Sequence, residues 1–286
     1  MSESKLQTTL AHSFEPLDSG VAARLRNLTP ARVGLRQTGS SIATPELLNF
    51  QLAHARARDA VHAPLQPASL IAGLHSLLKS NQRSQSEVLL LYSAAKNRQT
   101  YLQRPDLGRK LDRPSQLRLR DRNSPQQHPP DQAIGIVIAD GLSALAVERH
   151  AVPFIAELLP LIAGLNIAPI CLVEQARVAI GDEIAHTLGA NLVIVLIGER
   201  PGLSSPDSLG AYITWQPHPG ITSDAERNCI SNIRAEGLSY PQAAARLLHY
   251  IREACSKRLT GVALKDPEPA QLHSGNPAAI EASTKP

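Results

Sequence analysis

The stretch Ala133–Gly141, AIGIVIADG, decides the fold, because it reads as a buried strand that ends in Asp-Gly. Two more apolar runs follow it, Ala168–Val173 (APICLV) and Leu192–Gly198 (LVIVLIG). Helical patterns over Ala151–Leu165 and Asp182–Leu188 separate these runs. Continuous apolar strands alternating with helices are typical of a parallel sheet covered on both faces. The sequence therefore predicts an α/β fold for the second half of the chain.

Ligands of such sheets bind beyond the carboxyl ends of the strands. Those ends are expected at Asp140–Ser143, Glu174–Val178 and Gly198–Gly202. The last of them, Gly-Glu-Arg-Pro-Gly, carries a charged pair between two glycines that allow close backbone approach, although it could also serve only as a turn. No strand is followed by G-x-G-x-x-G, and the chain has no G-x-x-x-x-G-K-[ST]. A conventional dinucleotide site and a P-loop are therefore not supported.

Weaker patterns extend the prediction in both directions. A fourth strand is expected near Ala211–Trp215, and Tyr240–Leu259 is a strongly amphipathic helix. In the first half, Thr44 followed by Pro45 marks a helix start. A second helix is expected over Ser69–Leu78, and Glu87–Tyr92 is a short strand candidate.

Composition changes along the chain predict its domain organisation. We expect a flexible leader over 1–20, a mainly helical N-terminal domain over 21–122 and a Pro/Gln-rich linker over 123–131. The sheet domain is then expected over 132–262, followed by a disordered tail over 263–286 that has few large apolar residues.

Composition also excludes several classes of protein. The 286 residues are 43% hydrophobic and 19% charged, which excludes wholesale disorder. No apolar run approaches the roughly 20 residues that span a bilayer, and the first residues have no apolar signal core. A cytoplasmic protein with no membrane partner is therefore expected.

The net charge of +4 is concentrated in one segment. Residues 98–122 hold eight basic and three acidic side chains, against 21 basic and 22 acidic in the remainder. Such a segment could attract nucleic acid, a phosphate-bearing ligand or an acidic partner, or it could be a subunit contact. Because aromatic residues are only 3% of the chain and no nucleic-acid motif is present, we expect no nucleic-acid partner.

No catalytic or metal-binding set can be assembled from the chain. The three cysteines are widely spaced without C-x-x-C, so a disulfide framework or zinc site is not expected. A lone cysteine of this kind is most often a small buried hydrophobe. The ten histidines fall in no H-E-x-x-H frame, and no G-x-S-x-G occurs. This pattern fits a subunit that holds a cofactor for a partner.

The chain resembles the small (light) subunit of ethanolamine ammonia-lyase. The resemblance covers most of residues 29–262 in the family's order, and the leader, the linker and the tail fall outside it. It is carried by five stretches: TPARVGLRQTGSSIATPELLNFQLAHARARDAV (Thr29–Val61), YLQRPDLGRKL (Tyr101–Leu111), IADGLSA (Ile138–Ala144), VIVLIGERPGLSSPDSLGAYITWQP (Val193–Pro217) and DAERNCISNIRAEGLSYPQAAA (Asp224–Ala245).

This resemblance implies an adenosylcobalamin-dependent carbon–nitrogen lyase that converts ethanolamine to acetaldehyde and ammonia by radical chemistry. It implies a helical N-terminal part, a Rossmann-like domain that binds cobalamin at the interface with a large catalytic subunit, and an assembly of six large and six small chains. The substrate site is expected on the large subunit. In many bacteria the family enzyme lies in a microcompartment, and packaging of this chain is left open.

Three family cobalamin contacts fall on matching positions: Val178 in Arg-Val after the second strand, Glu199 in G-E-R-P-G and Cys229 in R-x-C-I-S-N. Asp140 and Arg200 are expected as neighbours of the site. No His has Asp two residues before it, so the D-x-H-x-x-G motif that supplies a cobalt ligand in many mutases is absent. The resemblance thus implies that the cofactor keeps its own benzimidazole on cobalt.

Two other functions remain as alternatives. A Rossmann-like module for a nucleotide or phosphate ligand would explain the strand and loop pattern but not the R-x-C-I-S-N match. A nucleic-acid-binding protein would use the 98–122 segment, and its binding would depend steeply on salt.

Overall fold

The computed structural model describes residues 19–29, 31–83, 87–122 and 133–265. The expected linker over 123–131 lies outside the described residues, as do nearly all of the leader and the tail. The helices are α1 (Ser19–Leu28), α2 (Thr44–His62), α3 (Pro67–Ser80), α4 (Arg98–Gln103), α5 (Arg113–Arg122), α6 (Ala144–Leu161), α7 (Ile180–Leu188) and α8 (Tyr240–Lys257). The strands are β1 (Gln37–Thr38), β2 (Ser41–Ile42), β3 (Val88–Tyr92), β4 (Ile134–Ala139), β5 (Ile170–Glu174), β6 (Leu192–Gly198), β7 (Leu209–Trp215) and β8 (Asn228–Ile233).

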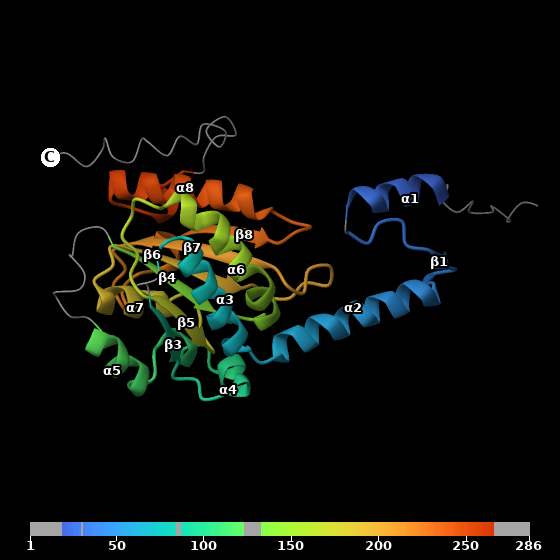
Figure 1. Cartoon of the computed structure of the whole chain (residues 1–286). Coiled ribbons are helices and arrows are strands. Elements are labelled where there is room, and N and C mark those ends of the chain that lie inside the picture. Colours follow the sequence, from blue (N-terminus) through green and yellow to red (C-terminus); the bar gives the residue numbers. More distant parts are fainter. Residues whose placement is uncertain (1–18, 30, 84–86, 123–132, 266–286) are drawn as a thin grey trace, which may run out of the picture. The chain divides into compact units, whose positions relative to one another are not determined.

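A six-stranded sheet in the order β3-β5-β4-β6-β7-β8 organises the larger part of the chain (Figure 1). The first four of these strands are parallel, as the alternation of apolar runs and helices predicts. All residues of β4 and β6 are buried. The mixed α/β class and the Rossmann-like parallel sheet are therefore confirmed.

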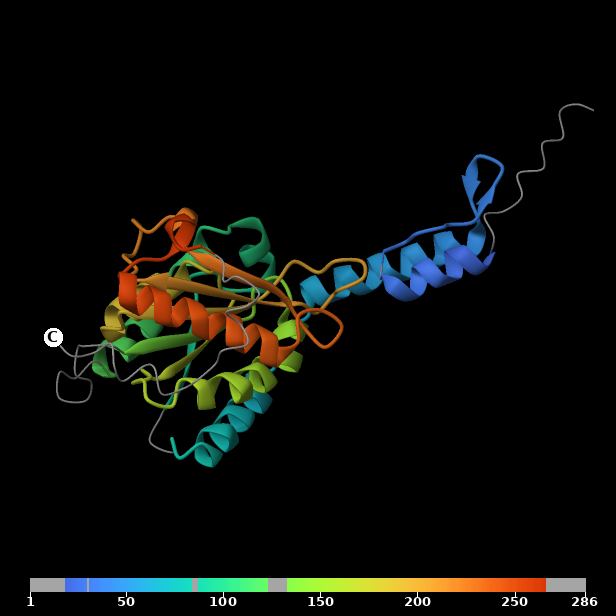
Figure 2. The ribbon, with the colours of Figure 1, turned by 90° about the horizontal axis from the view of Figure 1, so that it is seen from above.

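Helices cover both faces of the sheet (Figure 2). On one face, alternate strand residues such as Ile136 and Ile194 pack with buried residues of α3, α6 and α8. On the other face, Val137 and Val195 pack with α7 and with Leu119 of α5. Since α6 follows β4 and α7 follows β5, the two crossovers run over opposite faces. The carboxyl ends of β4, β5 and β6 therefore lie together at one edge, where the chain reverses its direction across the sheet.

The sheet is not parallel throughout. β7 pairs with β6 and with β8 in antiparallel register, and β8 has no counterpart in the sequence prediction. The connection from β6 to β7, residues 199–208, is shorter than the dozen or more residues that a parallel crossover needs, and neither connection contains an α-helix to cross the sheet. The sequence did not predict β8, because NCISNI is half polar and lacks the regular alternation of a strand. The burial of its residues is irregular in the same way.

The compact division of the chain falls inside α2. One unit comprises residues 1–56 and the other residues 57–286. β3 comes from within the stretch 21–122, and its full length pairs with β5. α3 from the same stretch packs in the core with α6. The stretch 57–122 thus contributes an edge strand and covering helices to the sheet unit.

The first unit contains α1, the β1–β2 pair and most of α2. Gly34 has a positive φ of 60° and lies against Ala22, where a Cβ would approach to 2.8 Å. Arg26 Nε donates to the carbonyl of Val33 at 3.1 Å. Many large apolar side chains of this unit are exposed, among them Leu25, Leu28, Leu47, Leu48, Phe50 and Leu52.

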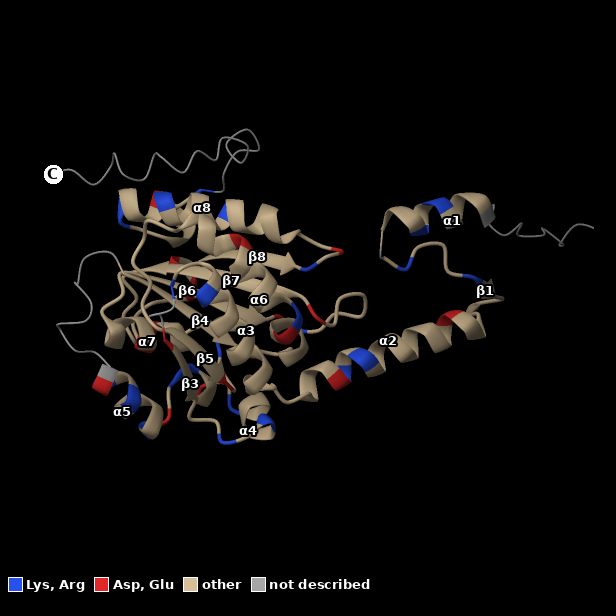
Figure 3. Cartoon of the chain, viewed as in Figure 1, with Lys and Arg blue, Asp and Glu red and all other residues tan. Residues whose placement is uncertain are grey.

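Figure 3 marks the basic residues of the segment 98–122 on α4, on α5 and on the loop between them. Arg98 forms an ion pair with buried Asp140 at 3.3 Å, and Arg118 donates to the carbonyl of Leu90 at 2.6 Å. Arg109, Lys110, Arg113 and Arg120 are exposed. Part of the segment's charge is therefore used within the fold.

Within the described residues, no helix is both long and apolar enough to cross a bilayer.

Two glycines allow the ends of β4 and β6 to meet. A Cβ on Gly198 would lie 2.0 Å from the carbonyl oxygen of Ser143, and a Cβ on Gly141 would lie 2.2 Å from the carbonyl oxygen of Gly198. Leu142 N donates to the carbonyl of Gly198 at 2.9 Å. Because the obstacles are backbone atoms, no rotamer change can relieve the clash.

We expect Gly198→Ala to lower the free energy of unfolding by about 3 kcal/mol, since overpacking against backbone forces the two strand ends apart. Gly164→Ala is the matched control, because a Cβ there meets nothing within 4 Å. Urea unfolding of the full-length chain, followed by circular dichroism, measures both. Equal midpoints for the two variants would contradict this account of the strand ends.

Candidate functional site

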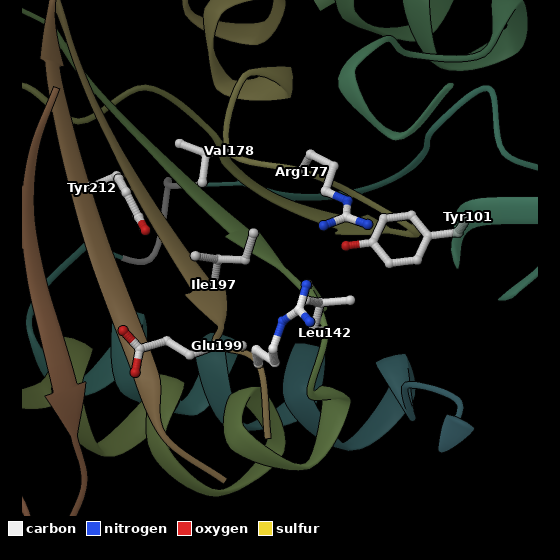
Figure 4. Close-up of a pocket in the computed structure, with 10 residues that line it drawn as sticks. Tyr101, Leu142, Arg177, Val178, Ile197, Glu199 and Tyr212 are labelled. Atoms are coloured by element: carbon white, nitrogen blue, oxygen red, sulfur yellow. The ribbon is translucent and has the colours of Figure 1, made fainter. Parts of the chain in front are cut away.

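A pocket of about 430 Å³ lies at the carboxyl ends of the parallel strands (Figure 4). Each of the three predicted strand ends contributes to it, and so does β7. The lining residues are Tyr101, Gly141, Leu142, Arg177, Val178, Ile197, Gly198, Glu199, Arg200 and Tyr212. The pocket therefore lies where the strand order predicts a ligand site.

Val178 and Glu199, two of the three predicted contact residues, line this pocket. Val178 lies in the turn after β5, where it is half-buried and packs against the core below. Its carbonyl accepts a hydrogen bond from Gly181 N at 3.1 Å at the start of α7. Val178 thus supplies a fixed apolar wall.

Glu199 presents a carboxylate that the protein holds in one orientation. Its Oε2 accepts a hydrogen bond from Ser208 Oγ at 2.7 Å and another from the backbone N–H of Asn232 at 3.2 Å. Its Oε1 lies over Gly210, and a Cβ on Gly210 would be 3.0 Å from this oxygen. Since both bonds go to Oε2, Oε1 can accept a hydrogen bond from a ligand.

Cys229, the third predicted residue, adjoins the pocket without lining it. It lies on β8 directly opposite Tyr212 of β7, and Tyr212 does line the pocket. The thiol is hydrogen-bonded to Tyr212 and lies 3.3 Å from Ser231 Oγ. Burial of the sulfur raises the pKa of the Cys229 thiol, and the hydrogen bonds partly offset this shift.

The expectation of buried thiols holds for one cysteine of three. Cys171 is buried in the sheet, whereas the residues Cys229 and Cys255 are exposed. For Cys229 the expectation is wrong for the residue as a whole, because β8 is the edge strand among the described residues, although its sulfur is covered by Tyr212 and Ser231. Within the described part of the chain, no group of three or more His, Cys, Asp or Glu side chains is arranged to hold a metal ion.

Asp140 and Arg200, the expected neighbours, have different positions. Arg200 lines the pocket and is exposed. Asp140 is buried. Its Oδ1 accepts a hydrogen bond from Ala176 N at 2.9 Å, and its Oδ2 forms an ion pair with Arg98. Burial raises the pKa of Asp140, while these partners favour its charged form. Asp140 therefore joins the strand ends of β4 and β5 and does not face the pocket.

Tyr101, Arg177 and Tyr212 were missed by the sequence prediction. Tyr101 is fully buried, and its hydroxyl donates to the carbonyl of Ala176 at 3.0 Å. Burial raises the pKa of this phenol above its usual range. The Arg177 guanidinium stacks on the Tyr101 ring, with Cζ 4.5 Å from the ring centroid. Tyr101 and Tyr212 occur in the quoted stretches and Arg177 in the predicted strand end Glu174–Val178, but no spacing rule links Tyr101 of α4 to the end of β5.

Gly108 explains why the Tyr101–Leu111 stretch reaches this site. A Cβ on Gly108 would lie 2.9 Å from the Tyr101 ring and 3.0 Å from Arg177 Cγ. The carbonyl of Gly108 accepts a hydrogen bond from Arg177 N at 2.8 Å. The Arg-Pro-Asp-Leu-Gly-Arg run thus supports one wall of the pocket from behind.

The fold and the pocket define an α/β protein with a ligand-sized pocket at the carboxyl edge of its parallel strands. Residues 20–265 match the family described as ethanolamine ammonia-lyase light chain. The chain is 56% identical over 245 residues to an ethanolamine ammonia-lyase small subunit from Azotobacter vinelandii, covering 85% of this chain and 87% of the relative. It is 57% identical over 244 residues to one from Pseudomonas fluorescens, covering 85% of each chain, and 54% identical over 254 residues to one from Pseudomonas paraeruginosa, covering 88% and 89%. The chain therefore belongs to the family of ethanolamine ammonia-lyase small subunits.

The raised pKa of Cys229 predicts slow alkylation at neutral pH. Only the thiolate reacts, so a pKa above the ordinary value of about 8.5 lowers the rate below that of a free thiol. Peptide mass spectrometry measures the rate of iodoacetamide labelling as a function of pH. We expect this rate to reach half its maximum at a pH above the ordinary thiol pKa of about 8.5. Tyr212→Phe removes a hydrogen bond that stabilises the thiolate, so it should raise the midpoint further. A midpoint at or below that of a cysteine in a short blocked peptide would contradict the burial of this sulfur.

Proposed function

We propose that this chain is the cobalamin-binding subunit of an ethanolamine ammonia-lyase and that it works only together with a large catalytic subunit. One observation carries the proposal. Val178 and Glu199, which the family resemblance singles out as cobalamin contacts, come from different strand ends and line one pocket. Cys229, the third such residue, is joined to that pocket through Tyr212.

The residues present fit a cobalamin. The cofactor presents neutral amides, one phosphate and a benzimidazole, so a site for it needs hydrogen-bond acceptors, apolar walls and few charges. Glu199 Oε1 can accept from an amide N–H, and Val178, Ile197 and Leu142 supply apolar surface. Gly141 and Gly198 also line the pocket, where the absence of a side chain lets a ligand approach the backbone closely.

A partner chain is needed to complete the site. A corrinoid is larger than a pocket of about 430 Å³, so this chain can cover only one part of it. The exposed leucines and Phe50 of α1 and α2 offer apolar surface of the kind that partner chains cover. The exposed arginines of α5 offer a second contact surface. An assembly of six large and six small chains is the arrangement that the family resemblance implies.

Adenosylcobalamin, when bound, supplies the radical chemistry by which ethanolamine is converted to acetaldehyde and ammonia. The residues of this chain would hold and orient the cofactor and help exclude water. Glu199 would hold one rim of the ligand by accepting an amide hydrogen, and Val178 and Ile197 would cover an apolar surface. The groups that bind ethanolamine would belong to the large subunit.

We expect Glu199→Gln to weaken cobalamin binding by about tenfold, because the carboxylate accepts a stronger hydrogen bond than a neutral amide. Equilibrium dialysis of adenosylcobalamin against the complex with the large subunit measures the dissociation constant. Glu157→Gln, an exposed residue of α6 outside the pocket, is the matched control and should leave it unchanged.

Titration of the same complex with nucleotides separates the proposal from the nucleotide-module alternative. Saturable cobalamin binding with no nucleotide binding is expected. Nucleotide binding without cobalamin binding would overturn the proposed function, and so would turnover of ethanolamine by this chain alone with adenosylcobalamin. Equal affinity of the Glu199→Gln and unchanged complexes would remove Glu199 from the site.

A further inference from the structure

Arg177 carries a positive charge that the described part of the chain does not neutralise. Its guanidinium lines the pocket, and no carboxylate of the described residues lies within ion-pair distance of it. Its Nε is buried and has no hydrogen-bond partner among these residues. A buried donor without a partner is costly, and where one persists beside a pocket it points to a ligand.

The protein nevertheless holds Arg177 firmly in place. The guanidinium lies over the face of Tyr101 at 4.5 Å from the ring centroid, and the backbone N–H is bound to Gly108. Tyr101 cannot move away because it is fully buried and its hydroxyl is bound to Ala176. The stack fixes the plane of the guanidinium and leaves its edge, with its N–H donors, for another group.

Arg98 provides a comparison within the same cluster. It approaches the same ring at 4.9 Å, but its charge is paired with Asp140, although its Nη2, like Arg177 Nε, is buried with no hydrogen-bond partner among the described residues. Its Nη1 contacts Asp140 at 3.3 Å and donates to the carbonyl of Gly141 at 2.8 Å, and its Nε donates to the carbonyl of Val61 at 2.6 Å. Of the two cations on this ring, only Arg177 has its charge free for a ligand.

The pocket therefore has two chemically different ends. Arg177 and Tyr101 lie on one side of it, Glu199 and Tyr212 lie on the other, and Ile197 lies between them (Figure 4). A ligand that fits this arrangement has an anion at the Arg177 end and neutral hydrogen-bond donors at the Glu199 end. An anion at the Glu199 end would be repelled by its carboxylate.

We propose that Arg177, held by Tyr101, binds the phosphodiester of the cofactor's nucleotide tail. The proposal rests on the proposed function, because it assigns a part of the same ligand to a part of the same pocket. The phosphate is the only anionic group of that tail, whereas its side chains are neutral amides. A planar guanidinium pairs with two phosphate oxygens at once, and a half-buried one does so with less screening than exposed Arg200.

The test uses two corrinoids that differ only in the phosphate, cobinamide phosphate and cobinamide. Their dissociation constants are measured by equilibrium dialysis against the complex with the large subunit. We expect the unchanged complex to prefer cobinamide phosphate by about tenfold or more, the size expected for a charge-assisted bidentate pair. Arg177→Gln should abolish that preference and leave the affinity for cobinamide unchanged.

Matched variants separate this contact from general effects. Arg120→Gln removes a positive charge from an exposed position of α5 outside the pocket and should keep the full preference. Arg113→Gln, at another exposed position of α5, should keep it as well. Unchanged cobinamide affinity in Arg177→Gln itself shows that the variant is folded.

The possible outcomes distinguish the two proposals. Equal preference for the phosphate in the Arg177→Gln and unchanged complexes, with tight corrinoid binding in both, would overturn the role of Arg177 alone. A complex that binds neither corrinoid would overturn the proposed function and this inference with it. Titration with AMP separates the corrinoid's phosphate from that of a free nucleotide, and Arg177-dependent binding of AMP in place of the corrinoid would also overturn the assignment.

Discussion

The close approach of two backbone segments, after β4 and after β6, is the constraint on which the site depends. Gly141 and Gly198 have no side chains, so the carbonyl of Gly198 can accept a hydrogen bond from Leu142 N across the gap. This contact brings the carboxyl ends of neighbouring strands together where the chain reverses its direction across the sheet. Glu199 follows directly and therefore has a fixed position at the rim of the pocket.

The other wall of the pocket comes from a distant part of the sequence. The Tyr101 ring of α4 stacks against the guanidinium of Arg177, which follows β5. Gly108 has no side chain that would separate these two residues. The basic segment that stands out in the sequence is thus partly a structural support, since Arg98 neutralises buried Asp140. A pocket built in this way has a cationic end and an acidic end, yet it is too small to enclose a corrinoid, which agrees with a subunit that shares its ligand with a partner.

The sequence predicts the parts of the fold that depend on local periodicity. The buried runs of β4, β5 and β6 are long and apolar, and their carboxyl ends place Val178 and Glu199 at one edge by topology alone. β8 could not be predicted because its residues alternate irregularly, and Cys229 was assigned only through the family resemblance. Tyr101 and Arg177 were missed because their contact joins segments 76 residues apart, which no local pattern encodes.

A cryo-electron microscopy structure of the complex with its large subunit and adenosylcobalamin tests the central claim most directly. The account predicts corrinoid density that spans the two subunits, touches Val178 and Glu199, and places the phosphate of the nucleotide tail against Arg177. Density that contacts only the large subunit and leaves the pocket at the carboxyl ends of β4, β5 and β6 empty would contradict it.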